Sequence, residues 1–156
     1  MKWVVLAALV VAFGALGCQQ ATRAIDMTGL TGPRLTDEEQ IAVILNEVHR
    51  GMEEQRIFRV LAHVSKSYED QEGRDYEGIQ QYLRELFRDY RDIRITRPRP
   101  RIMVQGRRAR VVETFGTEAR PRNPDADRPI NMHGQVIVYF EKTGDTWQII
   151  EWGPLQ

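Results

Sequence analysis

The hydrophobic period of this chain changes once, near Asp92, and that change most limits the folds open to it. Before this point, apolar residues recur every three or four positions, as they do in amphipathic helices. After it, apolar and polar residues alternate, as they do in half-buried strands. Helices followed by a run of antiparallel strands predict an α+β domain, in which a curved antiparallel sheet wraps around one long helix.

Three helices are predicted, and the first has a defined start. Thr36 and Glu39 have the spacing of a capping box, in which each side chain bonds to a backbone N–H of the other residue. A second, shorter helix is expected from Arg56 to Val64, and the clearest helical period runs from Tyr76 to Tyr90. The domain is expected to span residues 36–156, because about 120 residues support one hydrophobic core and not two.

The strands are expected to be separated by turn-forming residues. Pro98 and Pro100 cannot donate to a ladder, so a strand that contains them must be an edge strand or be bulged there. The segment from Glu118 to Pro129 is rich in Arg, Pro, Asn and Asp, and it predicts a long exposed loop. Residues 142–145, which include Gly144, predict the turn of a closing hairpin formed by residues 135–141 and 146–152.

The N-terminal segment is typical of an export signal. Lys2 precedes a short apolar run, and small residues lead to Cys18, the only cysteine of the chain. This order resembles the lipobox of bacterial lipoproteins, although Ala15 stands where leucine is usual. The resemblance implies that residues 1–17 are a signal peptide and that the thiol of Cys18 carries acyl chains such as palmitate.

A chain acylated at Cys18 would be anchored in a membrane of the cell envelope. Residues 18–35 are polar and without period, so they predict a flexible tether between the lipid and the domain. Gln19 beside the cysteine favours the periplasmic face of the outer membrane. The expected partner of this segment is therefore membrane lipid.

The composition argues against several kinds of partner and site. Lys2 is the only charged residue of the signal, which leaves 21 of the 22 Lys and Arg against 22 Asp and Glu. This balance gives no general attraction to nucleic acid. The three histidines show no zinc-ligand spacing, and no cofactor motif is present, so neither a metal nor a cofactor is expected. The arginine-rich segment from Arg94 to Arg110 predicts either a basic stripe on the sheet or protection of an edge strand from pairing.

Three segments resemble the nuclear transport factor 2-like superfamily, also called SnoaL-like. They are Glu39-Gln-Ile-Ala-Val-Ile-Leu in the first helix, Val64 to Asp70, and the closing strand Trp147-Gln-Ile-Ile-Glu-Trp152. The resemblance covers about residues 36–152 and implies a cone-shaped α+β fold, with a homodimer through the sheet face as one possible assembly. Members include isomerases, dehydratases, hydrolases and proteins without catalysis, so the fold alone assigns no activity.

An enzyme of this fold would place polar groups in the mouth of the cone, and His63, Tyr68 and Asp70 are the catalytic candidates. In an extended segment Tyr68 and Asp70 share a face, so a phenol and a carboxylate could share a proton. The alternative is that Tyr68 packs in the core while Asp70 caps the following turn. His63 could lie beside the interior of the cone. The alternative is that it is a partly exposed histidine at the end of the second helix.

Tyr139, Trp147 and Glu151 are the ligand-binding candidates, although aromatic residues of a small sheet equally form its core. No paired acid and base is evident in the sequence. The preferred hypothesis is therefore a non-catalytic binding or scaffold module, whose partner is an envelope protein or a small apolar ligand. The alternative is a small-molecule-binding protein, or an enzyme of the isomerase or dehydratase kind, that uses the cone cavity.

Overall fold

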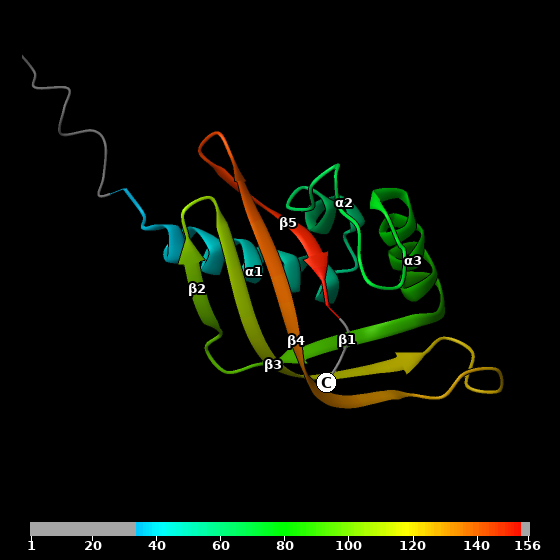
Figure 1. Cartoon of the computed structure of the whole chain (residues 1–156). Helices are drawn as coiled ribbons and strands as arrows, with labels where there is room; N and C mark the ends of the chain where they lie inside the picture. The colour runs from blue at the N-terminus through cyan, green and yellow to red at the C-terminus, as the bar shows by residue number, and fades with distance from the viewer. Residues whose placement is uncertain (1–33, 154–156) are drawn as a thin grey trace, which may run out of the picture. The chain divides into compact units, whose positions relative to one another are not determined.

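The computed structural model describes residues 34–153 (Figure 1). Within this range three helices precede five strands: α1 (Asp37–Glu53), α2 (Ile57–Leu61), α3 (Tyr76–Asp89), β1 (Tyr90–Thr96), β2 (Arg101–Gln105), β3 (Arg108–Pro121), β4 (Ile130–Thr143) and β5 (Thr146–Trp152). The predicted signal peptide, Cys18 and nearly all of the predicted tether lie outside the described residues. No helix within residues 34–153 combines the length and the apolar character that crossing a bilayer requires.

The strands form one antiparallel sheet in the order β1-β3-β4-β5, with β2 also paired to β3. The strands β1 and β2 share one edge of β3: Thr96 pairs with Gly116, and Arg101 pairs with Val112. Residues 97–100, which contain both prolines, lie in the gap between these two strands. The prolines are tolerated there because no ladder hydrogen bond is required of them.

The core lies between the helices and one face of the sheet. Helix α1 contacts β1 and β2, and α3 contacts β1 (Figure 1). The sheet contributes the buried residues Val111, Val138, Phe140, Trp147 and Ile149, and the helices contribute Ile41, Leu45, Val48, Ile79, Leu83 and Phe87. Burying each large apolar side chain contributes about 1.5–3 kcal/mol relative to its exposure, so this set is the main source of stability.

The start of α1 is held as the capping-box spacing predicts. Thr36 Oγ1 accepts from the N–H of Glu39 at 3.2 Å, and the N–H of Thr36 donates to Glu39 Oε2 at 2.8 Å. The next residue ties this helix end to the final hairpin, because Asp37 Oδ1 accepts from Lys142 Nζ at 2.6 Å and from Trp147 Nε1 at 2.9 Å. These bonds fix the direction in which α1 crosses the sheet.

The helix α2 packs closely on the end of α1, and Gly51 makes this approach possible. A Cβ atom on Gly51 would lie 2.9 Å from Val60 Cγ2, closer than such atoms approach in proteins. The predicted end of α2 was wrong: the helix stops at Leu61, and Val64 instead forms a bridge with Ile149 of β5. Pairing with the sheet therefore replaces the last helical turn.

The predicted loop from Glu118 to Pro129 was also too long. Strand β3 continues to Pro121, so only residues 122–129 connect it to β4. Ala119 and Pro121 are buried while Glu118 and Arg120 are exposed, so the alternation of a half-buried strand is present in spite of the polar composition. The closing hairpin was predicted correctly, with its turn at residues 144–145.

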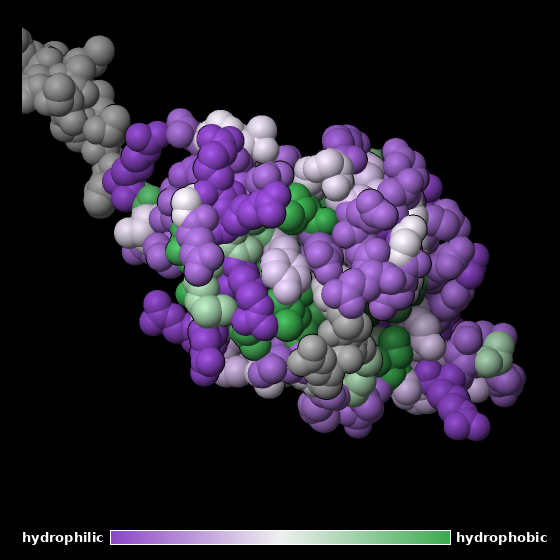
Figure 2. All heavy atoms as spheres, in the orientation of Figure 1, coloured by the Kyte–Doolittle hydropathy of each residue, from purple (hydrophilic) through white to green (hydrophobic). Residues whose placement is uncertain are grey.

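The surface in the view of Figure 2 is largely hydrophilic. Apolar side chains appear there only in small areas separated by polar ones. The most exposed large apolar side chain within the described residues is that of Phe58, at 81%. It stands on α2 as a single residue, and scattered apolar residues of this kind are normal on protein surfaces.

Candidate functional site

A buried polar cluster lies between α1 and the sheet. Glu113 extends from β3 with its side chain only 3% exposed, and His49 of α1 places Nε2 at 3.2 Å from Glu113 Oε2. Arg97, the residue after β1, places Nη1 at 3.3 Å from Glu113 Oε1. Arg97 Nη2 also donates to Oδ1 of Asn46. A carboxylate, an imidazole and a guanidinium from three parts of the chain therefore meet inside the domain, and the exposed amide of Asn46 contacts the guanidinium at the surface.

Regular secondary structure explains why these side chains converge. Asn46 and His49 are three residues apart on α1, so they lie on one face of the helix. Ala109, Val111 and Glu113 are all buried, which shows that they occupy alternate, inward positions of β3. The helix and the sheet thus direct their polar residues toward each other across the core.

Two polar atoms of this cluster are left without hydrogen-bond partners among the described residues. They are Nδ1 of His49 and Oε1 of Glu113; both are buried, and the contact of Glu113 Oε1 with Arg97 Nη1 at 3.3 Å is an ion pair without hydrogen-bond geometry. A proton on His49 Nε2 would face the Glu113 carboxylate, which leaves Nδ1 as an unused acceptor. Orphaned buried polar atoms are uncommon in native proteins, so they mark a position that a ligand group or a water molecule would complete.

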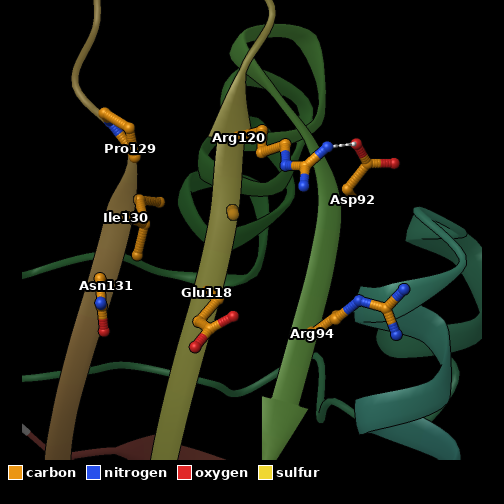
Figure 3. A pocket seen from close by; sticks show the side chains of 8 residues that line it. Asp92, Arg94, Glu118, Arg120, Pro129, Ile130 and Asn131 are labelled. Atoms are coloured by element: carbon orange, nitrogen blue, oxygen red, sulfur yellow. Dashed lines mark ion pairs between the residues drawn. The ribbon is translucent and has the colours of Figure 1, made fainter.

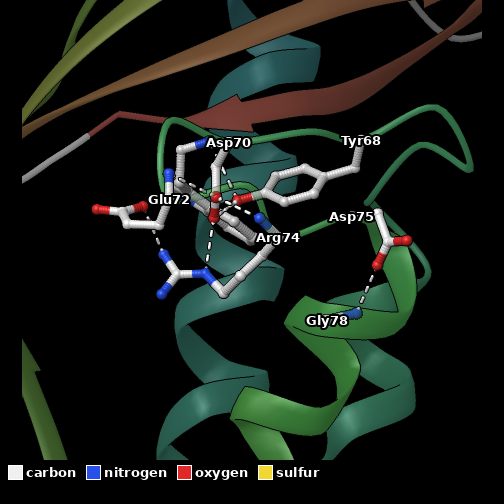
Figure 4. Close-up of polar contacts among 7 residues, drawn as sticks. Tyr68, Asp70, Glu72, Arg74, Asp75 and Gly78 are labelled. Carbon is white, nitrogen blue, oxygen red and sulfur yellow. Dashed lines mark hydrogen bonds and ion pairs between the residues drawn. The ribbon is translucent and has the colours of Figure 1, made fainter.

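The predicted catalytic pair Tyr68 and Asp70 is brought together, but its hydrogen bonds are all in use (Figure 4). The Tyr68 hydroxyl donates to Asp70 Oδ2 at 3.0 Å, and Arg74 Nε donates to the same oxygen at 2.7 Å. Asp70 Oδ1 accepts from the backbone N–H groups of Glu72 at 3.0 Å and Arg74 at 2.9 Å. Both readings of the sequence therefore describe part of the arrangement: the pair shares a hydrogen bond, and Asp70 also caps the turn.

The electrostatics of this turn keep both groups in their ordinary protonation states. Burial alone would raise the pKa of Asp70, but hydrogen bonds from Arg74 and Tyr68 outweigh it and lower the pKa below its usual value. Burial, followed by the hydrogen bond to Asp70, raises the pKa of Tyr68 far above its usual value. At neutral pH the phenol stays protonated and the carboxylate stays charged. The hydrogen bonds of Tyr68, Asp70 and Arg74 thus hold the turn at residues 68–75 in place before α3. Asp75 caps the first turn of α3 by accepting from the N–H of Gly78 (Figure 4).

His63 lies just after α2 and is separate from this pair. Burial lowers its pKa, so its imidazole is neutral at neutral pH. Within residues 34–153, no hydrogen bond or ion pair links its side chain to Tyr68 or Asp70. The three catalytic candidates do not form a single hydrogen-bonded group.

The three predicted ligand-binding residues do not converge either. Trp147 is 1% exposed and donates to Asp37, so its side chain belongs to the core. Tyr139 and Glu151 are cross-strand neighbours on β4 and β5. Glu151 Oε1 accepts from Gln71 Nε2 at 3.1 Å. Tyr139 lies between the fully buried Val138 and Phe140, so the alternation of β4 places it on the opposite face of the sheet from the core.

A hollow of about 440 Å³ lies over β1, β3 and the start of β4 (Figure 3). Its charged groups are matched: Arg120 Nη1 lies 3.9 Å from Asp92 Oδ2, and Arg94 stands opposite Glu118 in the strand register. Such pairing leaves no net charge to attract an ionic ligand. Within residues 34–153, no group of three His, Cys, Asp or Glu side chains is arranged to hold a metal ion.

The buried cluster was not predicted, although part of its signal is in the sequence. Glu113 stands between Val111 and Phe115 at an inward position of an alternating strand, where an acidic residue is unusual. This pattern could have identified Glu113 as a buried charge. Nothing in the sequence identifies His49, 64 positions earlier, as its partner.

The sequence matches no protein-family model and no curated protein. Solved structures share its fold. A candidate scytalone dehydratase from Novosphingobium aromaticivorans has a TM-score of 0.65 and 14% identity, over 75% of this chain and 82% of that one. A nuclear transport factor 2-like superfamily protein from Salmonella enterica has a TM-score of 0.63 and 15% identity, over 74% and 87%.

A type 2 hexachlorocyclohexane dehydrochlorinase has a TM-score of 0.64 and 10% identity, over 75% of this chain and 83% of that one. Identities this low establish the fold alone. The predicted fold class is therefore confirmed: residues 34–153 have an α+β fold like that of these nuclear transport factor 2-like proteins, with a curled antiparallel sheet.

Proposed function

We propose that this protein is a lipoprotein of the cell envelope, which carries its nuclear transport factor 2-like domain on a tether of about 18 residues at the periplasmic face of the outer membrane. The support is the apolar leader that ends in small residues and Cys18. Two or three acyl chains on Cys18 would hold the chain in the membrane, because each buried methylene contributes about 0.8 kcal/mol.

The anchor is tested by metabolic labelling with a palmitate analogue in a bacterial host. The full-length chain is expected to take up the label and to fractionate with membranes, and a Cys18→Ser variant is expected to do neither. Equal labelling and equal localisation of the two proteins would contradict the proposed anchor.

The domain itself is proposed to be a binding module without catalysis. The observation that carries this proposal is the buried cluster of His49, Glu113 and Arg97, which the exposed Asn46 contacts from the surface. A buried carboxylate is costly to the fold even when a guanidinium pairs with it, and the cluster also leaves Nδ1 of His49 without a partner among the described residues, so we take the cluster as a site that a ligand completes. Tyr68 and Asp70 are not needed for this role, because their hydrogen bonds hold the turn before α3.

Native mass spectrometry of the full chain, extracted in a mild non-ionic detergent, tests the binding role. A small molecule is expected to co-purify with the wild-type protein and to be lost in Glu113→Gln, which has the same shape without the charge. Tyr139→Phe is the matched control, because Tyr139 lies on the other face of the sheet. The same mass for wild type and Glu113→Gln would argue against a ligand at this site.

A second candidate function is proton transfer by His49, and the orphaned Nδ1 atom favours it. A general base needs a free nitrogen held in one orientation by a partner on the other nitrogen, and the Glu113 carboxylate beside Nε2 supplies that partner. The names of two structural neighbours, a candidate scytalone dehydratase and a hexachlorocyclohexane dehydrochlorinase, denote eliminations of water and of hydrogen chloride, and in both a proton leaves the substrate.

The tautomer of His49 tests this second function. Long-range ¹H–¹⁵N spectra of the histidine rings are expected to show a protonated Nε2 and a bare Nδ1 in the wild type, and a mixture of tautomers in Glu113→Gln. A proton on Nδ1 of the wild type would exclude this nitrogen as the base. His133, an exposed histidine, serves as the internal reference.

We also propose that the domain forms a homodimer through the outer face of the sheet. That face carries both signs of charge, with Arg110 and Glu151 on either side of Tyr139, so a two-fold arrangement could pair unlike charges between copies. Sedimentation of the full chain in detergent tests this proposal. A protein that sediments as a monomer at micromolar concentration would contradict it.

A further inference from the structure

A second hollow, of about 550 Å³, opens beside the buried cluster. It is lined by Ala42 and Asn46 of α1 and by residues 95–100, which end β1 and lead toward β2. This lining contains two arginines, Arg97 and Arg99, and no acidic residue. In this respect it differs from the hollow of Figure 3, in which each arginine has an acidic neighbour.

Arg97 is held in place before any ligand arrives. Its side chain is 16% exposed and lies between the Glu113 carboxylate and the Asn46 amide. A guanidinium has five N–H groups, and these two contacts account for only two of them. An arginine fixed in this way loses little side-chain entropy when it binds a further acceptor, so it is suited to an oxygen anion.

Arg99 supplies a second positive charge at the same hollow. It is exposed and makes no ion pair with any residue in the part of the chain that the structure describes. Pro98 and Pro100 on either side restrict its backbone, because each ring fixes its own φ angle and limits the residue before it. The segment therefore presents Arg99 from a stiff support.

Two acidic groups touch the lining residues, but neither lines the hollow. Glu113 is buried and paired with Arg97 and His49, and Glu53 Oε1 accepts from the backbone N–H of Ile95 at 2.8 Å. The charge of Glu113 is thus offset by Arg97, and Arg99 remains uncompensated at the hollow. The local balance favours an anion.

We infer that this hollow is a binding site for a small oxyanion, a carboxylate or a phosphate, held by Arg97 and Arg99 together. This inference deepens the proposed binding function by naming the class of ligand group, and it does not depend on the lipid anchor. The anionic group would occupy the hollow, with the Asn46 amide in its wall as a further polar contact. Arginine is the residue best matched to such groups, because its N–H donors can bind two oxygens at once.

Inorganic phosphate is the probe for a direct test. Full-length protein in non-ionic detergent micelles is titrated with phosphate at constant ionic strength, and the backbone amides of Ala42 and Thr96 are followed by ¹H–¹⁵N spectroscopy. We expect saturable shifts at both residues, with a dissociation constant on the order of 1 mM. Absence of saturable shifts at these residues would overturn the inference.

Substitutions distinguish binding at a specific site from general attraction of phosphate to surface charge. Arg99→Gln is expected to weaken phosphate binding about fivefold to tenfold, since it removes one charge-assisted contact. Arg101→Gln is the matched control, because Arg101 is an exposed arginine two residues away on β2 that does not line the hollow. Equal weakening by both variants would show non-specific attraction and would overturn the inference. Arg97 itself is left intact, because its loss would strand the buried Glu113 charge.

The same titration distinguishes the source of the anion. A short-chain phosphatidylglycerol that binds more tightly than inorganic phosphate, and loses this advantage in Arg99→Gln, would assign the site to a lipid headgroup. Equal affinities would assign it to a soluble ligand. Co-purification of a ligand that depends on Glu113, together with no phosphate binding, would refute the oxyanion site and leave the proposed binding function standing.

Discussion

Replacing Asp70 by asparagine tests whether this carboxylate is a structural element of the domain. Asparagine has the same shape, and its carbonyl oxygen can still accept the N–H groups of Glu72 and Arg74. Its amide nitrogen then faces two donors, the Tyr68 hydroxyl and Arg74 Nε, which now lie 3.0 and 2.7 Å from Asp70 Oδ2. Two charge-assisted hydrogen bonds are lost in a site where the Asp70 side chain has no exposed surface.

The expected cost follows from these contacts. A hydrogen bond to a charged group contributes about 1.5–3 kcal/mol, and leaving a buried donor unpaired adds to the loss. The hydrogen bond from Arg74 contributes less than this range, because the Arg74 side chain is 35% exposed and keeps its ion pair with Glu72 at 2.8 Å. We therefore expect Asp70→Asn to lower the free energy of unfolding by about 2–4 kcal/mol, out of a total of roughly 5–15 kcal/mol.

Urea unfolding followed by circular dichroism measures this difference. Tyr68→Phe is the matched control, because it removes only one of the two bonds to Asp70 Oδ2 and is expected to cost about 1.5 kcal/mol, less than Asp70→Asn. The pH dependence gives an independent readout. Since the folded state lowers the pKa of Asp70, the stabilisation is present above the ordinary pKa near 4 and is lost as the pH falls below it. A loss below about 1 kcal/mol, with the same acid profile for wild type and Asp70→Asn, would refute the structural role.

Two further substitutions follow from the packing and from the N-terminus of α1. Gly51→Ala is expected to lower the midpoint of thermal unfolding, because the added Cβ would overlap with Val60. This loss is expected to exceed the gain from the higher helix propensity of alanine, so a higher midpoint would contradict the close contact. Asp37→Asn is expected to lower the midpoint at neutral pH, and to lower it less at about pH 3. Hydrogen bonds from Lys142 and Trp147 lower the pKa of Asp37, and the stabilisation that they give is lost when Asp37 is protonated. An equal difference at both pH values would contradict this assignment.

Local patterns were enough to predict the elements that local forces determine. The capping box of Thr36 and Glu39 marks the start of α1 to the residue, and the apolar stripe of residues 76–90 predicts α3 within one position. The turn at Gly144 is signalled equally well, because its φ of +61° is one that glycine readily adopts. Each of these signals lies within a few residues of the structure that it specifies.

The cluster at Glu113 could not be predicted in the same way, because its members come from separate parts of the chain. Alternation along β3 shows that Glu113 points inward, but only the packed domain shows that His49 and Arg97 reach it. The reverse applies to Tyr68 and Asp70, whose closeness in sequence offered both a contact between them and a turn capped by Asp70 as alternatives, and the structure contains both. Whether that contact serves chemistry or the fold depended on Arg74, whose N–H groups complete the bonding of the carboxylate.

The central claim is that His49, Glu113 and Arg97 are kept for binding and not for stability, and one measurement tests it most directly. The three residues are replaced together by leucine, and the free energy of unfolding of the full chain is measured in urea. Replacing a buried ionic triad by apolar residues is often neutral or stabilising by about 1–4 kcal/mol, so the triple variant is expected to be at least as stable as the wild type. A triple variant less stable by more than about 3 kcal/mol would show that the fold depends on this cluster, and would contradict the claim.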